Sequence, residues 1–155
     1  MRHRLPDTRL STTHKFSVGG CECYIIVGLY ETRKPGEIFF RAGNSLHDKF
    51  PGMEAALEMW CIAISMLMQE GHWPTLYRKF AHQRFEPSGF VSDPEVKNAK
   101  SIVDYIIRWI DKEFFHEMEQ ERIQQPGPES RTEKETERKK EQESRDASPE
   151  ETQET

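Results

Sequence analysis

The end of this chain contains no aromatic and no branched aliphatic residue, and this limits where a folded core can form. Between Gln124 and Thr155 the sequence has ten acidic and six basic residues. Such a segment cannot bury enough apolar surface to offset an ordering entropy of about 1–2 kcal/mol per residue. We therefore predict a polar lead-in at residues 1–12, one folded domain over residues 13–118, and a charged disordered tail over residues 119–155.

Charge and composition exclude several classes of protein. Residues 1–123 carry 17 acidic and 16 basic residues, a balance that disfavours a nucleic-acid-binding function. No apolar run approaches the roughly 18–20 residues of a membrane span, and no apolar segment follows Met1 as in a secretory signal. Three cysteines are too few for a disulfide-rich secreted scaffold. We expect a cytoplasmic protein with reduced thiols.

The first third of the sequence predicts an antiparallel β-meander. Apolar and polar residues alternate over residues 14–18, 21–30 and 37–42, which is typical of strands. Gly28 is a candidate β-bulge, and Pro35-Gly36 fits the centre of a type II turn before the third strand. One face of the second strand is expected to carry Cys23, Ile25, Val27 and Leu29.

The middle of the sequence changes to helical periodicity. Residues 53–70 are apolar around most of the circumference, which predicts a nearly buried central helix that ends at Gly71. A second helix is predicted over residues 74–81. Ser92-Asp-Pro-Glu95 resembles a capping box and predicts a third helix that begins there and continues to Phe114. The predicted fold class is α+β, a three-stranded antiparallel β-meander packed against three helices.

Two cysteines of the second strand are candidate metal ligands. Cys21 and Cys23 carry thiols, which are good zinc ligands, but structural zinc sites commonly use two close pairs, and no second pair is present. Cys23 with His14 or His82 would also supply a nucleophile and a base, although no nucleophile elbow or phosphate loop accompanies them. We interpret these thiols as structural, with zinc binding as the alternative.

The remaining segments outside regular structure are residues 43–52, predicted to be a loop, and residues 82–89. The second segment combines an imidazole, a guanidinium and a carboxylate with Pro and Gly. In one interpretation Arg84 and Glu86 bind neighbouring backbone while Phe85 anchors the loop. In the other interpretation the polar side chains face a partner or ligand, and the candidate residues are His82, Arg84, Glu86 and Ser88.

Several motifs that occur in order over about residues 4–115 resemble those of one family. They are RLPDTR at 4–9, THKF at 13–16, VGLYE at 27–31, PGE at 35–37, RFEPSG at 84–89 and KSIVDYI at 100–106. This series is similar to the C-terminal region of adenosylcobalamin-dependent ribonucleotide reductases, which is called the TSCPD domain. The Ser-Cys-Pro-Asp motif of that name is absent, and the nearest stretch, Val91-Ser-Asp-Pro94, has no cysteine.

The resemblance implies a link to the reduction of ribonucleotides to deoxyribonucleotides. In the family, a cysteine thiyl radical generated with adenosylcobalamin performs this chemistry in a large upstream barrel. By similarity the activity would be that of a ribonucleoside-diphosphate reductase, but we expect no turnover from this chain alone, and adenosylcobalamin is implied only for the related full-length reductase. We expect an accessory domain that docks on a reductase core subunit. The alternatives are a nucleotide or regulatory-ligand binding module, a small zinc-binding domain, and an independent thiol enzyme.

Overall fold

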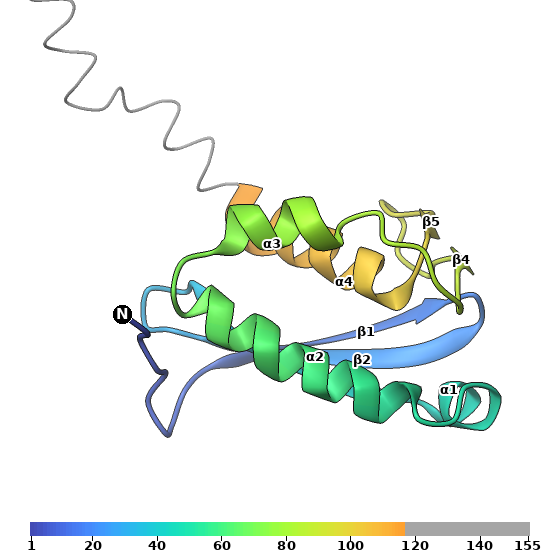
Figure 1. The fold of residues 1–155 in the computed structure, drawn as a ribbon, viewed down its shortest axis with the longest axis horizontal. Coiled ribbons are helices and arrows are strands. Elements are labelled where there is room, and N and C mark those ends of the chain that lie inside the picture. The colour runs from blue at the N-terminus through green and yellow to red at the C-terminus, as the bar shows by residue number, and fades with distance from the viewer. Residues whose placement is uncertain (117–155) are drawn as a thin grey trace, which may run out of the picture. The chain divides into compact units, whose positions relative to one another are not determined.

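The computed structural model describes residues 1–116, and their architecture is α+β, as the sequence predicts (Figure 1). Three antiparallel strands pair in the order β1-β2-β3. The strands are β1 (Ser11–Val18), β2 (Cys21–Leu29) and β3 (Pro35–Ala42). The helices are α1 (Asn44–Lys49), α2 (Met53–Met68), α3 (Trp73–Phe80) and α4 (Ile102–Ile110), and a π-helical turn, η1 (Asp111–Phe115), follows α4. A second, small sheet pairs β4 (Gly89–Phe90) with β5 (Asn98–Ala99).

The inner face of the large sheet carries the core, as the alternation in β2 predicts. Cross-strand pairs on this face join buried side chains, among them Ile25 with Phe40 and Val27 with Ile38. The predicted irregularity at Gly28 is confirmed, because the β2–β3 register shifts between Gly28 and Leu29. Apolar burial of this kind stabilises the fold by about 1.5–3 kcal/mol for each large side chain.

Helix α4 supplies the other half of the core. Its side chains Ile102, Ile106 and Ile110 are fully buried, and the Tyr105 ring lies 4.5 Å from that of Phe16 in β1. In Figure 1, α3 and α4 lie together on one side of the strands, and α2 runs along them below. The core therefore lies between the sheet and the helices.

Helix α2 covers the outer edge of β3 with polar side chains. The Ser65 hydroxyl accepts a hydrogen bond from the Ile38 N–H at 2.9 Å, and the Glu54 carboxylate accepts one from the Ala42 N–H at 3.0 Å. The Gln69 amide donates to the Gly36 carbonyl at 2.9 Å. An unpaired edge would otherwise expose these backbone groups to another strand, so the helix protects the edge.

The prediction that the 53–70 helix is nearly buried is wrong. Helix α2 buries one side, which includes Leu57, Cys61 and Ile64, but Met59 and Ile62 are 66% and 62% exposed. Because α2 lies along the edge of the sheet instead of across its face, only one side of the helix meets the core. The C-terminal signal is confirmed, since Gly71 has a left-handed φ of 84° after the last turn.

The prediction that residues 43–52 are a loop is also wrong, because they contain α1. This helix has six residues and one buried side chain, Leu46, so it is too short to show helical periodicity. The turn before β3 differs as well, since Pro35 begins the strand instead of the turn. Arg33, with a φ of 65°, donates its N–H to the Tyr30 carbonyl and makes the bend. Proline tolerates the first position of a strand because it has no N–H to pair.

The third helix begins nine residues later than the capping box predicts. Asp93 does accept the Glu95 N–H at 2.8 Å, but no helix follows. Instead β5 pairs with β4, which requires extended backbone, and α4 begins after Ser101. The Ser101 hydroxyl accepts the Asp104 N–H at 3.0 Å and is the true N-cap.

Of the two predicted terminal segments, the structure describes the N-terminal lead-in but not the tail. In the predicted lead-in, Arg2 donates to the Gln69 side chain at 2.6 Å and the His3 N–H donates to the Gln69 carbonyl. The predicted disordered tail, residues 119–155, lies outside the described residues. Within residues 1–116, no helix combines the length and the apolar character that crossing a bilayer requires.

Candidate functional site

The loop that follows α3 begins with a left-handed residue. His82 has a φ of 66°, which turns the chain away from the helix axis. Its backbone N–H donates to the Asp104 carboxylate at 2.7 Å, and its imidazole is exposed. A left-handed conformation costs a non-glycine residue free energy, so the hydrogen bond to Asp104 helps to hold it.

Asp104 is a fully buried carboxylate that joins three segments. Besides His82, it accepts the Lys100 N–H at 2.9 Å and two guanidinium hydrogen bonds from Arg108, at 3.0 and 2.9 Å. Burial by itself would raise the pKa of Asp104. The hydrogen bonds from the Lys100 and His82 N–H groups and the charge of Arg108 outweigh burial and hold this pKa below its ordinary value. The carboxylate is therefore ionised at neutral pH and fixes the loop on α4.

A second set of contacts completes this attachment. The Ser101 hydroxyl donates to the Gln83 carbonyl at 2.6 Å, and the Phe85 N–H donates to the Lys100 carbonyl at 3.2 Å. Phe85 is half-buried against the core, in keeping with the anchoring interpretation of this residue. The loop is thus held through the backbone groups of its first, second and fourth residues.

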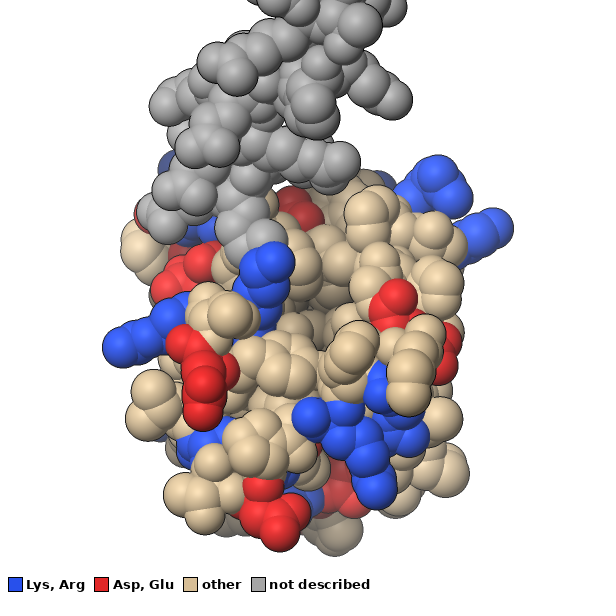
Figure 2. All heavy atoms as spheres, turned by 90° about the vertical axis from the view of Figure 1, so that its left-hand side faces the viewer, with Lys and Arg blue, Asp and Glu red and all other residues tan. Residues whose placement is uncertain are grey.

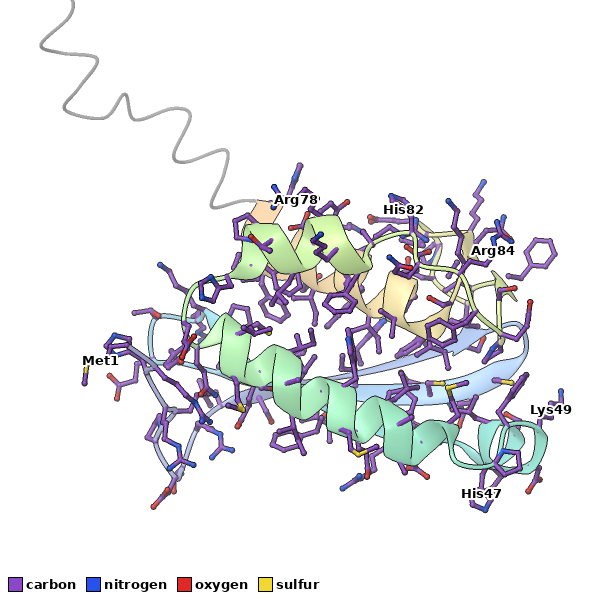
Figure 3. All side chains as sticks on the ribbon, in the orientation of Figure 1. Met1, His47, Lys49, Arg78, His82 and Arg84 are labelled. Atoms are coloured by element: carbon purple, nitrogen blue, oxygen red, sulfur yellow. The ribbon has the colours of Figure 1, made fainter. Side chains whose placement is uncertain are left out.

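The four candidate residues of this loop separate into two pairs. Glu86 accepts hydrogen bonds from the Ser88 N–H at 3.0 Å and the Ser88 hydroxyl at 2.9 Å, so these two residues stabilise the loop's own bend. Arg84 does not bind Glu86, and no ion pair forms at Arg84 within residues 1–116. Figure 3 shows His82 and Arg84 at the same end of the molecule, with the Arg84 side chain directed outward. The His82 imidazole is exposed, but its Nδ1 lies 3.7 Å from the Asp104 carboxylate.

The structure adds three residues that the sequence analysis did not identify. Phe90 is 80% exposed in β4, directly opposite Asn98 in β5. The exposed Lys97 and Lys100 flank β5. Strands of two residues have no periodicity, so only the tertiary pairing of β4 with β5 reveals this group. We define the loop surface as His82, Arg84, Phe90, Lys97 and Lys100.

The acidic residues Asp93 and Glu95, near the loop surface, bind other groups. Glu95 pairs with Lys112, and Asp93 accepts the Tyr105 hydroxyl at 2.8 Å. Lys97 and Lys100, like Arg84, form no ion pair within the described part of the chain. The loop surface therefore combines one exposed aromatic ring with several exposed basic side chains. By contrast, acidic and basic side chains are mixed over the uncovered part of the end that faces the viewer in Figure 2.

His14 belongs to a partly buried polar network instead of a catalytic pair. Its Nε2 lies 2.8 Å from the Tyr105 hydroxyl, and its ring stacks on Trp109 at 4.2 Å. Because the Tyr105 hydroxyl donates to Asp93, the His14 Nε2–H is the donor in this contact. Burial lowers the pKa of His14, although the negative charges of Asp93 and Glu113 oppose that shift.

The cysteines are poorly placed for nucleophilic or metal chemistry. Cys21, Cys23 and Cys61 are all buried, and burial raises the pKa of Cys23 and of Cys61 to about 12. These two thiols are therefore protonated at neutral pH, whereas both nucleophiles and metal ligands are thiolates. Cys21 and Cys23 also find no further ligand, since residues 1–116 contain no cluster of three or more His, Cys, Asp or Glu side chains suited to a metal ion.

Comparison with known proteins identifies the family. The pattern of the TSCPD domain matches residues 1–114. This chain belongs to the TSCPD domain family. The resemblance drawn from the sequence motifs is thereby confirmed.

The curated relatives of this TSCPD domain are much longer proteins. A vitamin B12-dependent ribonucleotide reductase of Rhodopirellula baltica is 43% identical over 110 residues, which are 70% of this chain and 10% of the relative. The enzyme of the same name from Streptantibioticus cattleyicolor is 37% identical over 115 residues, 74% of this chain and 18% of the relative. The chain thus spans less than a fifth of these relatives. No solved structure matches it significantly.

Two of the motifs that indicated the TSCPD family meet in the structure. RFEPSG, at 84–89, forms the loop after α3, and KSIVDYI, at 100–106, forms the start of α4. The Phe85–Lys100 backbone hydrogen bond joins the two motifs directly. The motifs are separate in sequence but form one rigid unit that presents the loop surface.

Proposed function

We propose that this TSCPD domain is accessory to ribonucleotide reduction and acts by docking on a ribonucleotide reductase core through the loop surface. The observation that supports this most is an exposed Phe90 in β4, next to a β5 strand that Lys97 and Lys100 flank. Neither lysine, nor Arg84 in the preceding loop, has an ion-pair partner in residues 1–116. The relatives carry the same domain within much longer reductases, and this makes a reductase core the natural partner.

The composition and rigidity of the loop surface suit protein recognition. Aromatic and arginine side chains contribute most of the energy at many protein interfaces, and cations favour an acidic partner surface. Because Asp104 and Ser101 hold the loop in one conformation, binding would lose little entropy through loop ordering. We expect the complementary patch on the reductase core to combine an apolar pocket for Phe90 with acidic residues.

The domain by itself does not fit the radical chemistry of the cobalamin-dependent enzymes. The three cysteines are at most 1% exposed, inside a small packed core, so a cofactor at the surface cannot reach their sulfur atoms. We therefore expect the purified chain, with adenosylcobalamin, a dithiol and ribonucleotides, to form no deoxyribonucleotide above background. Turnover that persists after removal of contaminating reductase would overturn this expectation.

The docking proposal can be tested by biolayer interferometry. The full chain is immobilised and exposed to a vitamin B12-dependent reductase from which the matching segment has been deleted. Arg84→Ala and Phe90→Ala should each weaken binding by at least about tenfold, a typical loss for an interface hot spot. The control is Arg78→Ala, an exposed arginine of α3 that Figure 3 places away from Arg84. Equal binding by all variants, or no binding by the wild type, would contradict the proposal.

A nucleotide-binding module is the second candidate, because the same residues favour it. An exposed ring such as Phe90 can stack on a base, and Arg84, Lys97 and Lys100 can bind phosphates. Isothermal titration of the chain alone with ribonucleoside and deoxyribonucleoside triphosphates separates the two candidates. Nucleotide binding that requires Phe90 but no reductase would favour this module over docking.

A further inference from the structure

One side of α2 exposes a continuous apolar stripe that is separate from the loop surface. We define the α2 face as the exposed residues Ala55, Ala56, Met59, Ile62, Ala63, Met66 and Leu67. They recur every three or four residues along the helix, and the opposite side of α2 meets the core. A helix that is apolar on all sides is normally buried on all sides, and contiguous exposed apolar patches commonly mark interaction sites.

We propose that the α2 face packs against the α2 face of a second copy of this chain, with the two helices antiparallel. The order of small and large residues is self-complementary in that orientation. With a two-fold axis that crosses the α2 face at the level of residue 61 along the helix, Ala55 lies opposite Leu67 of the second copy, and Ala56 lies opposite its Met66. Met59 then lies opposite Ala63 of the second copy. A two-fold contact requires such self-complementarity, because one patch must fit itself.

The helix dipoles favour the same orientation. An α-helix carries partial positive charge at its N-terminus and partial negative charge at its C-terminus, so an antiparallel pair places opposite partial charges beside each other. A parallel pair would bring like partial charges together.

The size of the α2 face sets the expected affinity. Stable specific interfaces bury about 1,200–2,000 Å² in total, and one helix pair reaches only the lower end of that range. We therefore expect a concentration-dependent dimer with a Kd on the order of 10 μM.

Sedimentation velocity on the full chain, from low to high micromolar concentration, tests the proposal. The wild type should shift from monomer to dimer. Ile62→Glu, which places like charges beside the two-fold axis, should remain monomeric at every concentration with an unchanged Tm, because Ile62 is exposed. Thr75→Glu introduces the same charge at an exposed position of α3 and should dimerise like the wild type. A monomeric wild type, or a dimeric Ile62→Glu, would overturn the proposal.

Cysteine cross-linking tests the orientation of the helices. Ile62→Cys should form an interchain disulfide on mild oxidation, since the two copies of this residue meet beside the axis. Leu67→Cys should not, because an antiparallel pair separates the two copies of residue 67 by about 18 Å along the helix. Efficient cross-linking of Leu67→Cys would overturn the antiparallel arrangement.

The same variants distinguish this proposal from the docking proposal. If the wild type is monomeric and Ile62→Glu loses binding to the reductase core, the α2 face binds the reductase instead of a second copy. The second-copy proposal then fails while docking stands. If dimerisation is lost in Ile62→Glu but not in Arg84→Ala, the two surfaces act independently, and the α2 proposal holds even where docking fails.

Discussion

Individual charged residues in and around the loop have opposite roles, although the sequence shows only a group of polar side chains. Asp104 is fully buried and binds three segments, whereas Arg84, two residues after the left-handed His82, is exposed and unpaired within residues 1–116. Removing one partner of a buried ionic network leaves the other charges uncompensated, while an exposed side chain contributes little. Stability and binding should therefore depend on different residues of the same loop.

Thermal and urea unfolding of two variants checks this separation. Asp104→Asn should lower the free energy of unfolding by about 3 kcal/mol, because Arg108 and the two backbone N–H groups lose a charged acceptor. Arg84→Ala should stay within about 0.5 kcal/mol of the wild type. A large loss of stability in Arg84→Ala would show that the arginine is a structural residue and remove it from the proposed interface.

The half-buried His14 predicts a pH dependence of stability. Burial lowers its pKa in the folded state, so the unfolded chain binds the proton more readily. The stability due to neutral His14 should be complete above its unfolded pKa, about 6.5, and should decrease as the pH falls below that value. His14→Phe should flatten the dependence of Tm on pH between about 5 and 7. Identical pH profiles for wild type and His14→Phe would contradict this assignment.

Among the elements, β2 shows how strand alternation controls cysteine chemistry. Cys21 and Cys23 are two residues apart, so both point to the inner face of the sheet and are buried. Cys61 faces the same core from the buried side of α2. The side-chain period of a strand thus places Cys21 and Cys23 in the core, and the period of a helix places Cys61 there. Their position fits a packing role.

The thiols should therefore be inert in the folded protein. Ellman's reagent should react slowly with all three cysteines under native conditions and rapidly after denaturation, because the native thiols are buried and Cys23 and Cys61 have pKa values near 12. Added Zn²⁺ should not change the native rate. Fast native labelling, or strong protection by zinc, would revive the thiol-enzyme or zinc-binding alternative.

At the scale of the whole molecule, the two proposed surfaces occupy different elements of one domain. The loop surface lies on the α3–β4 loop, β4 and the residues that flank β5, and the α2 face lies on a helix that borders β3. A chain that docks on a reductase through one surface and dimerises through the other would bring two reductase cores together. The relatives carry this domain within one long chain, so its effect there would be intramolecular.

Deletion of residues 124–155 should leave the Tm nearly unchanged, because that segment offers no large apolar side chain to the core. The truncated chain should be less soluble, since residues 124–155 contribute four of the five net negative charges. Differential scanning calorimetry of the two chains provides the comparison. A drop of several degrees in the truncated chain would mean that the tail packs on the domain.

Local patterns in the sequence determined the strands, the inner face of β2, the bulge at Gly28 and the end of α2 at Gly71. Each of these depends on residues within one element, where side-chain period and glycine conformation act directly. The TSCPD motifs identified the family without any structure. They did not show how RFEPSG and KSIVDYI meet.

Tertiary structure decided the features that depend on competition between distant segments. Asp93 and Ser101 are both good capping residues, and α4 begins after Ser101 because Gln83 and β4 provide partners that keep the intervening residues extended. The apolar circumference of α2 does not reveal which side stays exposed, since that depends on its place beside β3. Phe90 and Lys100 come together only through β4–β5 pairing and the loop contacts of Phe85. Long-range hydrogen bonds and packing decide such alternatives, and a local sequence pattern does not indicate which distant segments will make these contacts.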